Sequence, residues 1–281
     1  NKKEILDKYR NETNKYLESL FSKSNKKIRA HLVNKFVNNY RDTLIRDYIT
    51  ENKVIDDSER LNRLLLISYA SYIVMLEARN KCWPYEYMAF SRRIGELWEP
   101  FCKIPFYHPL NKNIAVYKPM MFPAIQEKLK KNASDYIEHL SITNDEKEHL
   151  IKLYGNIWHF MDSESINMLL DLHIKKKTEK DSIYYDIDYK SGFSSNEKGN
   201  TNRLLMVAGI YKSAEKEHHN ILLVRQEEDQ NNHYLKKLKN SGLWETYCGE
   251  ETYDKIKELT GFNLKAWMNN NMDWNNDITS C

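Results

Sequence analysis

Large apolar and charged side chains alternate in residues 182–193, SIYYDIDYKSGF, and this period of two limits the fold more than any other stretch of the chain. Successive side chains of a strand point to opposite faces, so Asp186, Asp188 and Lys190 would share one face. The preceding segment 166–177, INMLLDLHIKKK, is a second strand candidate, and a short polar turn follows it. The two segments therefore predict a β-hairpin.

The part of the chain before the hairpin has a different period. Apolar residues recur at helical spacing up to about residue 101, so this part is expected to be all-helical. Residues 100–123 combine prolines with aromatic residues and have no sustained period. They predict an ordered loop or short extended segments packed on the helices. A helix is expected again over 124–160, with an interruption where Thr143 or Asn144 could cap a new start.

After the hairpin, spacing and composition predict a helix over 200–216 and a buried strand over 219–226. The expected fold class is therefore α/β (α+β), with a core over residues 124–230. A large N-terminal helical region, residues 1–123, would contribute to DNA contact or subunit pairing. Residues 231–281 are expected to form a tail of short helices divided by glycines.

Charge and cysteine content limit the compartment and the partners. The chain has 43 Lys and Arg against 40 Asp and Glu, so any attraction to polyanions must come from local clusters. Its four cysteines are widely separated and form no CxxC pair, which favours a reducing compartment.

The apolar run 64–76 is too short to span a bilayer and predicts a buried helix. We expect no membrane association and a cytoplasmic location, since the first residues do not resemble a signal peptide.

The charges of the D-x-D-x-K stretch have two explanations. An exposed face of a half-buried sheet would account for them. However, Asp171 lies in the otherwise apolar run MLLDLHI, where an unpaired carboxylate carries a desolvation cost. Hairpin pairing could bring Asp171 beside Asp188, and two adjacent carboxylates repel each other unless a divalent cation such as Mg²⁺ lies between them.

Such an arrangement suits the hydrolysis of phosphodiester bonds. A metal lowers the pKa of bound water and neutralises charge on the phosphate, and the ammonium of Lys190 could stabilise the same charge. The hairpin is therefore a candidate nuclease site.

The order helix, strand, Asp-bearing strand, D-x-K strand, helix, strand resembles the core of PD-(D/E)xK nucleases. In this resemblance Asp171 is the first acid, and DYK at 188–190 is the second half-motif. Leu170, rather than proline, precedes Asp171, and Asp162 and Asp186 are alternatives for the first acid.

Residues 182–225 and 235–262 resemble Type II restriction endonucleases, and the chain as a whole is most similar to a subunit of the heterodimeric enzymes that cut asymmetric sites. The resemblance implies Mg²⁺-dependent, site-specific cleavage of double-stranded DNA, with one strand cut by each subunit. It also implies a second, different nuclease subunit as partner, or a homo-oligomer when the chain is isolated.

The resemblance assigns roles to individual residues. Asp171, Asp188 and the carbonyl of Tyr189 would bind Mg²⁺, and Lys190 would act on the attacking water or on the scissile phosphate. Glu197 could supply a further oxygen, although an exposed loop glutamate is the commoner case.

Two basic groups are candidates for DNA contact. Lys175, Lys176 and Lys177 could bind phosphates near the hairpin tip, and Arg92 and Arg93 lie on a predicted helix that could reach guanine in the major groove. A solvated turn and a surface helix are the ordinary explanations for the two groups.

Two alternatives remain at this stage. One is a nuclease of the same fold that recognises DNA structure instead of sequence. The other is a non-catalytic DNA-binding or partner-binding protein whose hairpin charges lie on the surface. The motif EHH at 217–219 predicts a solvent-exposed turn rather than a metal site.

Overall fold

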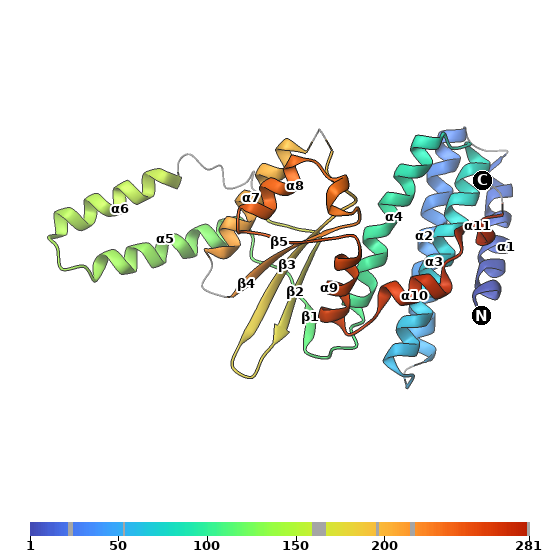
Figure 1. Ribbon diagram of the computed structural model, residues 1–281, viewed down its shortest axis with the longest axis horizontal. Coiled ribbons are helices and arrows are strands. Elements are labelled where there is room, and N and C mark those ends of the chain that lie inside the picture. The colour runs from blue at the N-terminus through green and yellow to red at the C-terminus, as the bar shows by residue number, and fades with distance from the viewer. Residues whose placement is uncertain (22–24, 53, 159–166, 195–196, 214–216, 280–281) are drawn as a thin grey trace. The chain divides into compact units, whose positions relative to one another are not determined.

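The computed structural model describes residues 1–21, 25–52, 54–158, 167–194, 197–213 and 217–279, and it divides into two compact units (Figure 1). The helical unit comprises Asn1–Lys112 and Glu250–Cys281, and the sheet unit comprises Asn113–Gly249. These limits differ from the expected boundaries at residues 123 and 230. The differences arise because short strands before and after the expected core belong to the sheet, and because the last helices pack with the N-terminal ones.

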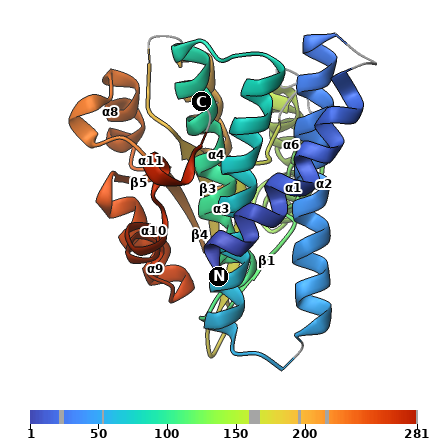
Figure 2. The ribbon, with the colours of Figure 1, turned by 90° about the vertical axis from the view of Figure 1, so that its right-hand side faces the viewer.

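The helical unit is built around one buried helix. Its elements are α1 (Lys2–Phe21), α2 (Lys26–Glu51), α3 (Asp57–Cys82), α4 (Tyr87–Tyr107), α9 (Glu250–Thr260), α10 (Leu264–Asn271) and α11 (Trp274–Asp277). Figures 1 and 2 show α1 and α2 beside α3, which is buried along most of its length. The expected helical structure up to residue 101 and the buried helix at 64–76 are both confirmed.

Helix α3 is the one described helix long and apolar enough to cross a membrane by length and composition. Of its most apolar window, 83% is buried inside the protein. A core helix of a folded domain has the same properties, so this finding gives no support for a membrane span.

Helix α4 continues through Pro100 and Pro105, so the loop expected from residue 100 was wrong for its first eight positions. A proline inside a helix costs about 3 kcal/mol because it removes a hydrogen bond and crowds the preceding turn. Three neighbouring side chains, Phe101, Cys102 and Phe106, are at most 3% exposed. Burying each aromatic ring contributes roughly 1.5–3 kcal/mol, which offsets the cost of the prolines.

The C-terminal residues join the helical unit through polar contacts with buried groups. Glu77 on α3 is 3% exposed and accepts hydrogen bonds from Arg10 at 2.7 Å and from the backbone N–H of Thr279 at 2.8 Å. On α4 the indole of Trp98 donates to the hydroxyl of Tyr253 on α9 at 3.0 Å. These contacts fix segments that are far apart in the sequence.

The sheet unit contains one five-stranded mixed sheet with the strands in sequence order. The strands are β1 (Ile114–Val116), β2 (Leu172–Lys177), β3 (Ser182–Lys190), β4 (His218–Val224) and β5 (Glu245–Cys248). Strands β1, β2 and β3 pair antiparallel, whereas β4 pairs parallel with both β3 and β5. The β2–β3 hairpin and the buried strand near 219–226 were predicted correctly, but β2 begins at Leu172 and not at the start of the expected segment 166–177. Strand β5 was missed because four residues are too few to show a period.

The parallel connection from β3 to β4 runs through helix α7 (Lys198–Lys212), as parallel pairing requires a crossover. Leu204, Val207 and Ala208 of α7 pack with Leu222 and Val224 of β4 in the main core of the unit. The other helices of this unit are α5 (Phe122–Glu138), α6 (Asn144–Trp158), the short 3-10 helix Glu228–Gln230 and α8 (His233–Asn240). The protein is therefore a mixed α+β fold, as expected.

The helix starts test the capping predictions. Thr143 precedes α6, and its hydroxyl accepts from the N–H of Glu146 while the Glu146 carboxylate accepts from the N–H of Thr143 at 2.9 Å. This reciprocal capping box confirms Thr143 as a cap. Helix α7 begins at Lys198, two residues earlier than expected, with Glu197 at the cap position.

Strand β4 supports the core of the sheet unit, because Leu222 is 0% exposed. We expect Leu222→Ala to lower the free energy of unfolding of this unit by about 2–5 kcal/mol, since it removes buried methyl groups and leaves a cavity. Hydrogen exchange of the β4 amides measures the change. Leu153→Ala on α6, where the side chain is 49% exposed, is the matched control and should change it by less than about 0.5 kcal/mol. Equal effects of the two substitutions would contradict this packing.

Candidate functional site

The charges of the D-x-D-x-K stretch lie inside the protein. Asp186 is 0% exposed and Asp188 is 1% exposed, while the side chain of Lys190 keeps 18% of its surface. The apolar residues that alternate with them, Tyr185, Ile187 and Tyr189, are also buried, so both faces of β3 are covered. The alternative of a solvent-exposed charged face is therefore wrong.

Asp171 lies at the end of β2 that faces Asp188. Leu172 pairs with Ile187 in the antiparallel ladder, and extending this register by one residue places Asp171 opposite Asp188. The Asp171 carboxylate accepts a hydrogen bond from the N–H of Tyr189 at 2.8 Å. The structure thus brings together the two predicted acids.

Two cations balance these carboxylates. The ammonium of Lys190 lies 2.5 Å from Oδ2 of Asp188, and the guanidinium of Arg203 on α7 lies 3.6 Å from Oδ1. Arg203 also donates to the backbone carbonyl of Leu169 at 3.3 Å, just before Asp171. The site therefore contains two carboxylates and two cations in a largely buried environment.

The pKa of Asp188 is raised to about 6. Burial is the main cause, because it disfavours the charged carboxylate. The positive charge of Lys190 lowers the pKa, and the negative charge of Asp171 raises it again. Because the folded-state pKa exceeds the unfolded value of about 3.9, the contribution of Asp188 to folding stability falls as the pH rises from about 4 to about 6.

Asp186 has the opposite environment. Its oxygens accept hydrogen bonds from Nδ1 of His173 at 2.7 Å, from Nδ1 of His218 at 2.6 Å and from the hydroxyl of Tyr117 at 3.0 Å. Burial alone would raise the pKa of Asp186, but the hydrogen bonds of the two histidines outweigh it, so the pKa is lowered. Both oxygens are already engaged by protein groups. Asp186 therefore has no oxygen left without a protein partner, which distinguishes it from Asp171, the other candidate for the first acid. The third candidate, Asp162, lies outside the described residues.

His173 connects Asp186 to the backbone before Asp171. Its Nε2 accepts a hydrogen bond from the N–H of Leu170 at 3.1 Å, so the ring proton is on Nδ1 and is donated to Asp186. The ring is 5% exposed. A neutral histidine therefore fixes the chain at the position from which Asp171 projects.

The donor set suits a hard divalent cation. Asp171 and Asp188 supply carboxylate oxygens, and the carbonyl of Tyr189 faces the same side as its N–H, which donates to Asp171. Among the described residues no three His, Cys, Asp or Glu side chains converge as a metal site. Mg²⁺ commonly binds through one or two carboxylates together with water and phosphate oxygens, so two carboxylates and a carbonyl are sufficient for it.

The predicted lysines lie apart from the carboxylates. Lys175–Lys177 occupy the end of β2 distant from Asp171, roughly 14–20 Å away at about 3.4 Å per residue. Lys176 and Lys177 pair with the first residues of β3 beside the hairpin turn. They could contact a long ligand such as DNA, and this stays a prediction.

Arg92 and Arg93 belong to the helical unit, where both ion-pair with Glu96 on the same helix, at 3.2 and 2.9 Å. Glu197 occupies the N-cap position of α7 without a side-chain capping bond, and its carboxylate accepts a hydrogen bond from the Asn200 amide at 3.0 Å. The DNA-binding and metal-binding roles suggested for these residues stay predictions.

Three residues of this region were missed by the sequence analysis: Arg203, Tyr117 and His218. The exposed turn expected at 217–219 was wrong for His218, which begins β4 and is hydrogen-bonded to Asp186. These residues are far from the hairpin in sequence and belong to no recognisable motif. Strand pairing brings Tyr117 and His218 to Asp186, and the α7 crossover between β3 and β4 brings Arg203 to Asp188.

Comparison of the chain with family models, with curated proteins and with solved structures gives no match.

The charge balance around Asp188 predicts the direction of two pKa changes. Lys190→Met should raise the pKa of Asp188 above about 6, because the nearest cation is removed. Asp171→Asn should lower it, because a neighbouring negative charge is removed. An NMR titration of the aspartate carboxyl carbons measures both. Lys180→Met in the hairpin turn is the control and should leave this pKa unchanged, and equal shifts in the two site variants would contradict the arrangement.

Proposed function

We propose that this protein is a Mg²⁺-dependent nuclease that hydrolyses phosphodiester bonds in double-stranded DNA. The proposal rests on one observation, the adjacent carboxylates of Asp171 and Asp188 with the ammonium of Lys190 2.5 Å from the second. Burial makes the negative form of Asp188 costly, and a bound cation would relieve this cost.

In the proposed site, Asp171, Asp188 and the Tyr189 carbonyl hold Mg²⁺. The metal, when bound, lowers the pKa of water and neutralises charge on the phosphate. Lys190 directs its ammonium to the attacking water or to a non-bridging phosphate oxygen, where it stabilises the charge that develops. Arg203 keeps the Asp188 carboxylate oriented from the α7 side. Lys190 is the residue whose loss should affect the reaction most directly.

The topology supports assignment to the PD-(D/E)xK class. An acid at the start of one strand faces a D-x-K strand, and a helix and a parallel strand follow. Within that class we propose a Type II restriction endonuclease subunit that cuts one strand of a specific site. A second, different subunit would cut the other strand. The lysines of β2 and the arginines of α4 are the proposed DNA contacts.

The decisive experiment is cleavage of supercoiled plasmid by the purified chain in Mg²⁺, alone and together with the protein encoded beside it. We expect discrete nicked or linear products, and nicking by the chain alone would support one strand per subunit. Lys190→Met should reduce the rate by about 10²–10³-fold, since it removes one charge that stabilises the transition state.

Lys180→Met in the hairpin turn is the matched control and should cut as fast as the parent. A smear of products would favour a nuclease that recognises DNA structure. Intact plasmid in every combination, or full activity of Lys190→Met, would contradict the nuclease assignment. DNA binding that is independent of Mg²⁺ and without cleavage would then indicate a binding protein.

A further inference from the structure

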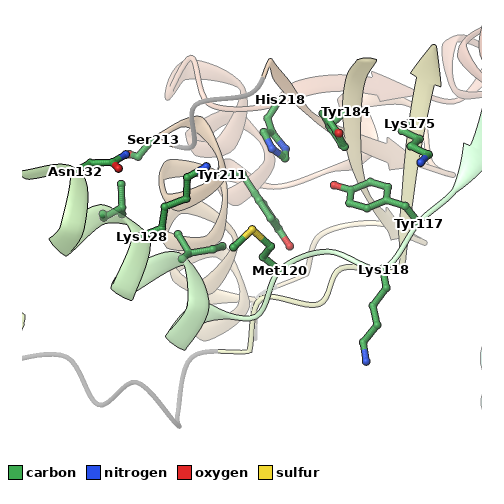
Figure 3. A pocket seen from close by; sticks show the side chains of 12 residues that line it. Tyr117, Lys118, Met120, Lys128, Asn132, Lys175, Tyr184, Tyr211, Ser213 and His218 are labelled. Atoms are coloured by element: carbon green, nitrogen blue, oxygen red, sulfur yellow. The ribbon is translucent and has the colours of Figure 1, made fainter. Parts of the chain in front are cut away.

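A second candidate site lies in the sheet unit on the other side of Asp186 from the proposed metal site. It is a pocket of about 330 Å³ between α5, the segment after β1 and the C-terminal end of α7 (Figure 3). Its described lining combines aromatic rings, lysines and a few apolar and polar side chains. This volume is at the lower end of the range for ligand pockets, roughly 300–1,000 Å³, so it suits one small molecule.

Stacked rings form one wall of the pocket. The imidazole of His218 lies between Tyr184 and Tyr211, with ring centroids 5.1 and 5.3 Å away and interplanar angles of 23° and 17°. Tyr117 meets Tyr184 edge-on at 5.1 Å. Figure 3 shows Tyr117, Tyr211 and His218 turned toward one another in the pocket. Such surfaces favour a flat aromatic group.

Hydrogen bonds to buried groups of the sheet unit hold the rings of Tyr117, Tyr211 and His218 in place. The buried carboxylate of Asp186 binds the hydroxyl of Tyr117 and Nδ1 of His218, and the hydroxyl of Tyr211 donates to the carbonyl of Met168 at 3.0 Å. One polar atom of each of these three rings is thus engaged before any ligand arrives. Binding to a preformed wall avoids much of the entropy cost of ordering side chains.

The charges of the pocket select an anion. Three lysines line it, Lys118, Lys128 and Lys175, of which Lys118 points away from the rings (Figure 3), and its described lining contains no carboxylate. Asn132 adds an amide at one end, where it could hydrogen-bond the edge of a heterocycle, and the Ser213 hydroxyl, which donates to the carbonyl of Gly209 at 2.9 Å, could accept a further hydrogen bond there. An aromatic face, polar edge groups and a cationic rim together match a nucleobase with an attached phosphate.

We propose that this pocket binds a single nucleotide, with the base against the rings of Tyr117 and Tyr211 and the phosphate toward the lysines. The nucleotide is either a free mononucleotide or one unit unstacked from a nucleic acid strand, since both present the same groups. The proposal is independent of the proposed cleavage, because it uses neither Asp171, Asp188 nor Lys190.

The test is binding to the full-length chain without Mg²⁺, in the parent and in the Lys190→Met variant. Isothermal titration with the four deoxynucleoside monophosphates tests the free ligand, and we expect at least one dissociation constant below about 1 mM. A duplex that contains 2-aminopurine opposite an abasic site tests the unstacked unit. The 2-aminopurine fluorescence should rise when this base leaves the stack.

Two neighbouring positions of α5 provide a matched pair of variants. Both positions are exposed, but Asn132→Trp would place an indole at the mouth of the pocket, whereas Lys131→Trp adds the same side chain at a position that does not line it. Asn132→Trp should weaken whichever binding is observed by at least about 10-fold, while Lys131→Trp should leave it unchanged. A response in the first arm identifies free nucleotides as the ligand, and a response only in the second identifies a strand.

Several results would overturn the proposal. These are the absence of both responses, equal weakening by the two tryptophan variants, and binding of inorganic phosphate or phosphotyrosine as tight as that of any nucleotide. Because the Lys190→Met variant should bind as the parent does, a failure of nucleotide binding is distinguishable from a failure of DNA cleavage.

Discussion

The burial of two carboxylates on one strand is the constraint on which the sheet unit depends. Asp186 and Asp188 lie two residues apart on β3, and each is at most 1% exposed. An unpaired charge at such positions would cost several kcal/mol, so each requires partners. Asp188 ion-pairs with cations from β3 and α7, whereas Asp186 accepts hydrogen bonds from rings on β2, β4 and the segment after β1. Satisfying two side chains thus fixes most of the surrounding elements.

The two carboxylates are satisfied in different ways, and this separates their roles. The pKa of Asp186 is lowered because short hydrogen bonds favour its charged form, whereas the pKa of Asp188 is raised to about 6 because burial prevails over its cations. A carboxylate that takes up a proton near neutral pH can exchange that proton for another cation. Asp186 therefore has a structural role, whereas Asp188 is the residue to which the proposed function assigns chemistry. Environments that push neighbouring pKa values apart are characteristic of functional sites.

Sequence reasoning predicted what depends on local pattern. The alternation in 182–193 predicted β3 and the shared face of Asp186 and Asp188, and Thr143 was correctly expected to cap α6. It failed where packing of distant residues determines the structure. Helix α4 passes through two prolines because neighbouring aromatic residues are buried, and β5 is too short to show a period.

Within the site, the carboxylates and Lys190 could be proposed from spacing. Arg203 and His218 could not, because only the β3–α7–β4 crossover brings them near.

The helical unit is discontinuous in sequence, since the whole sheet unit is inserted between α4 and α9. During synthesis the first four helices leave the ribosome well before their last partners. Until then Glu77 lacks its hydrogen bonds to Thr279, and Trp98 lacks Tyr253. The sheet has all its strands earlier, by residue 248. The sheet unit is therefore expected to complete its fold before the helical unit. The helical unit would then stay incompletely folded, and open to chaperones and proteases, for longer.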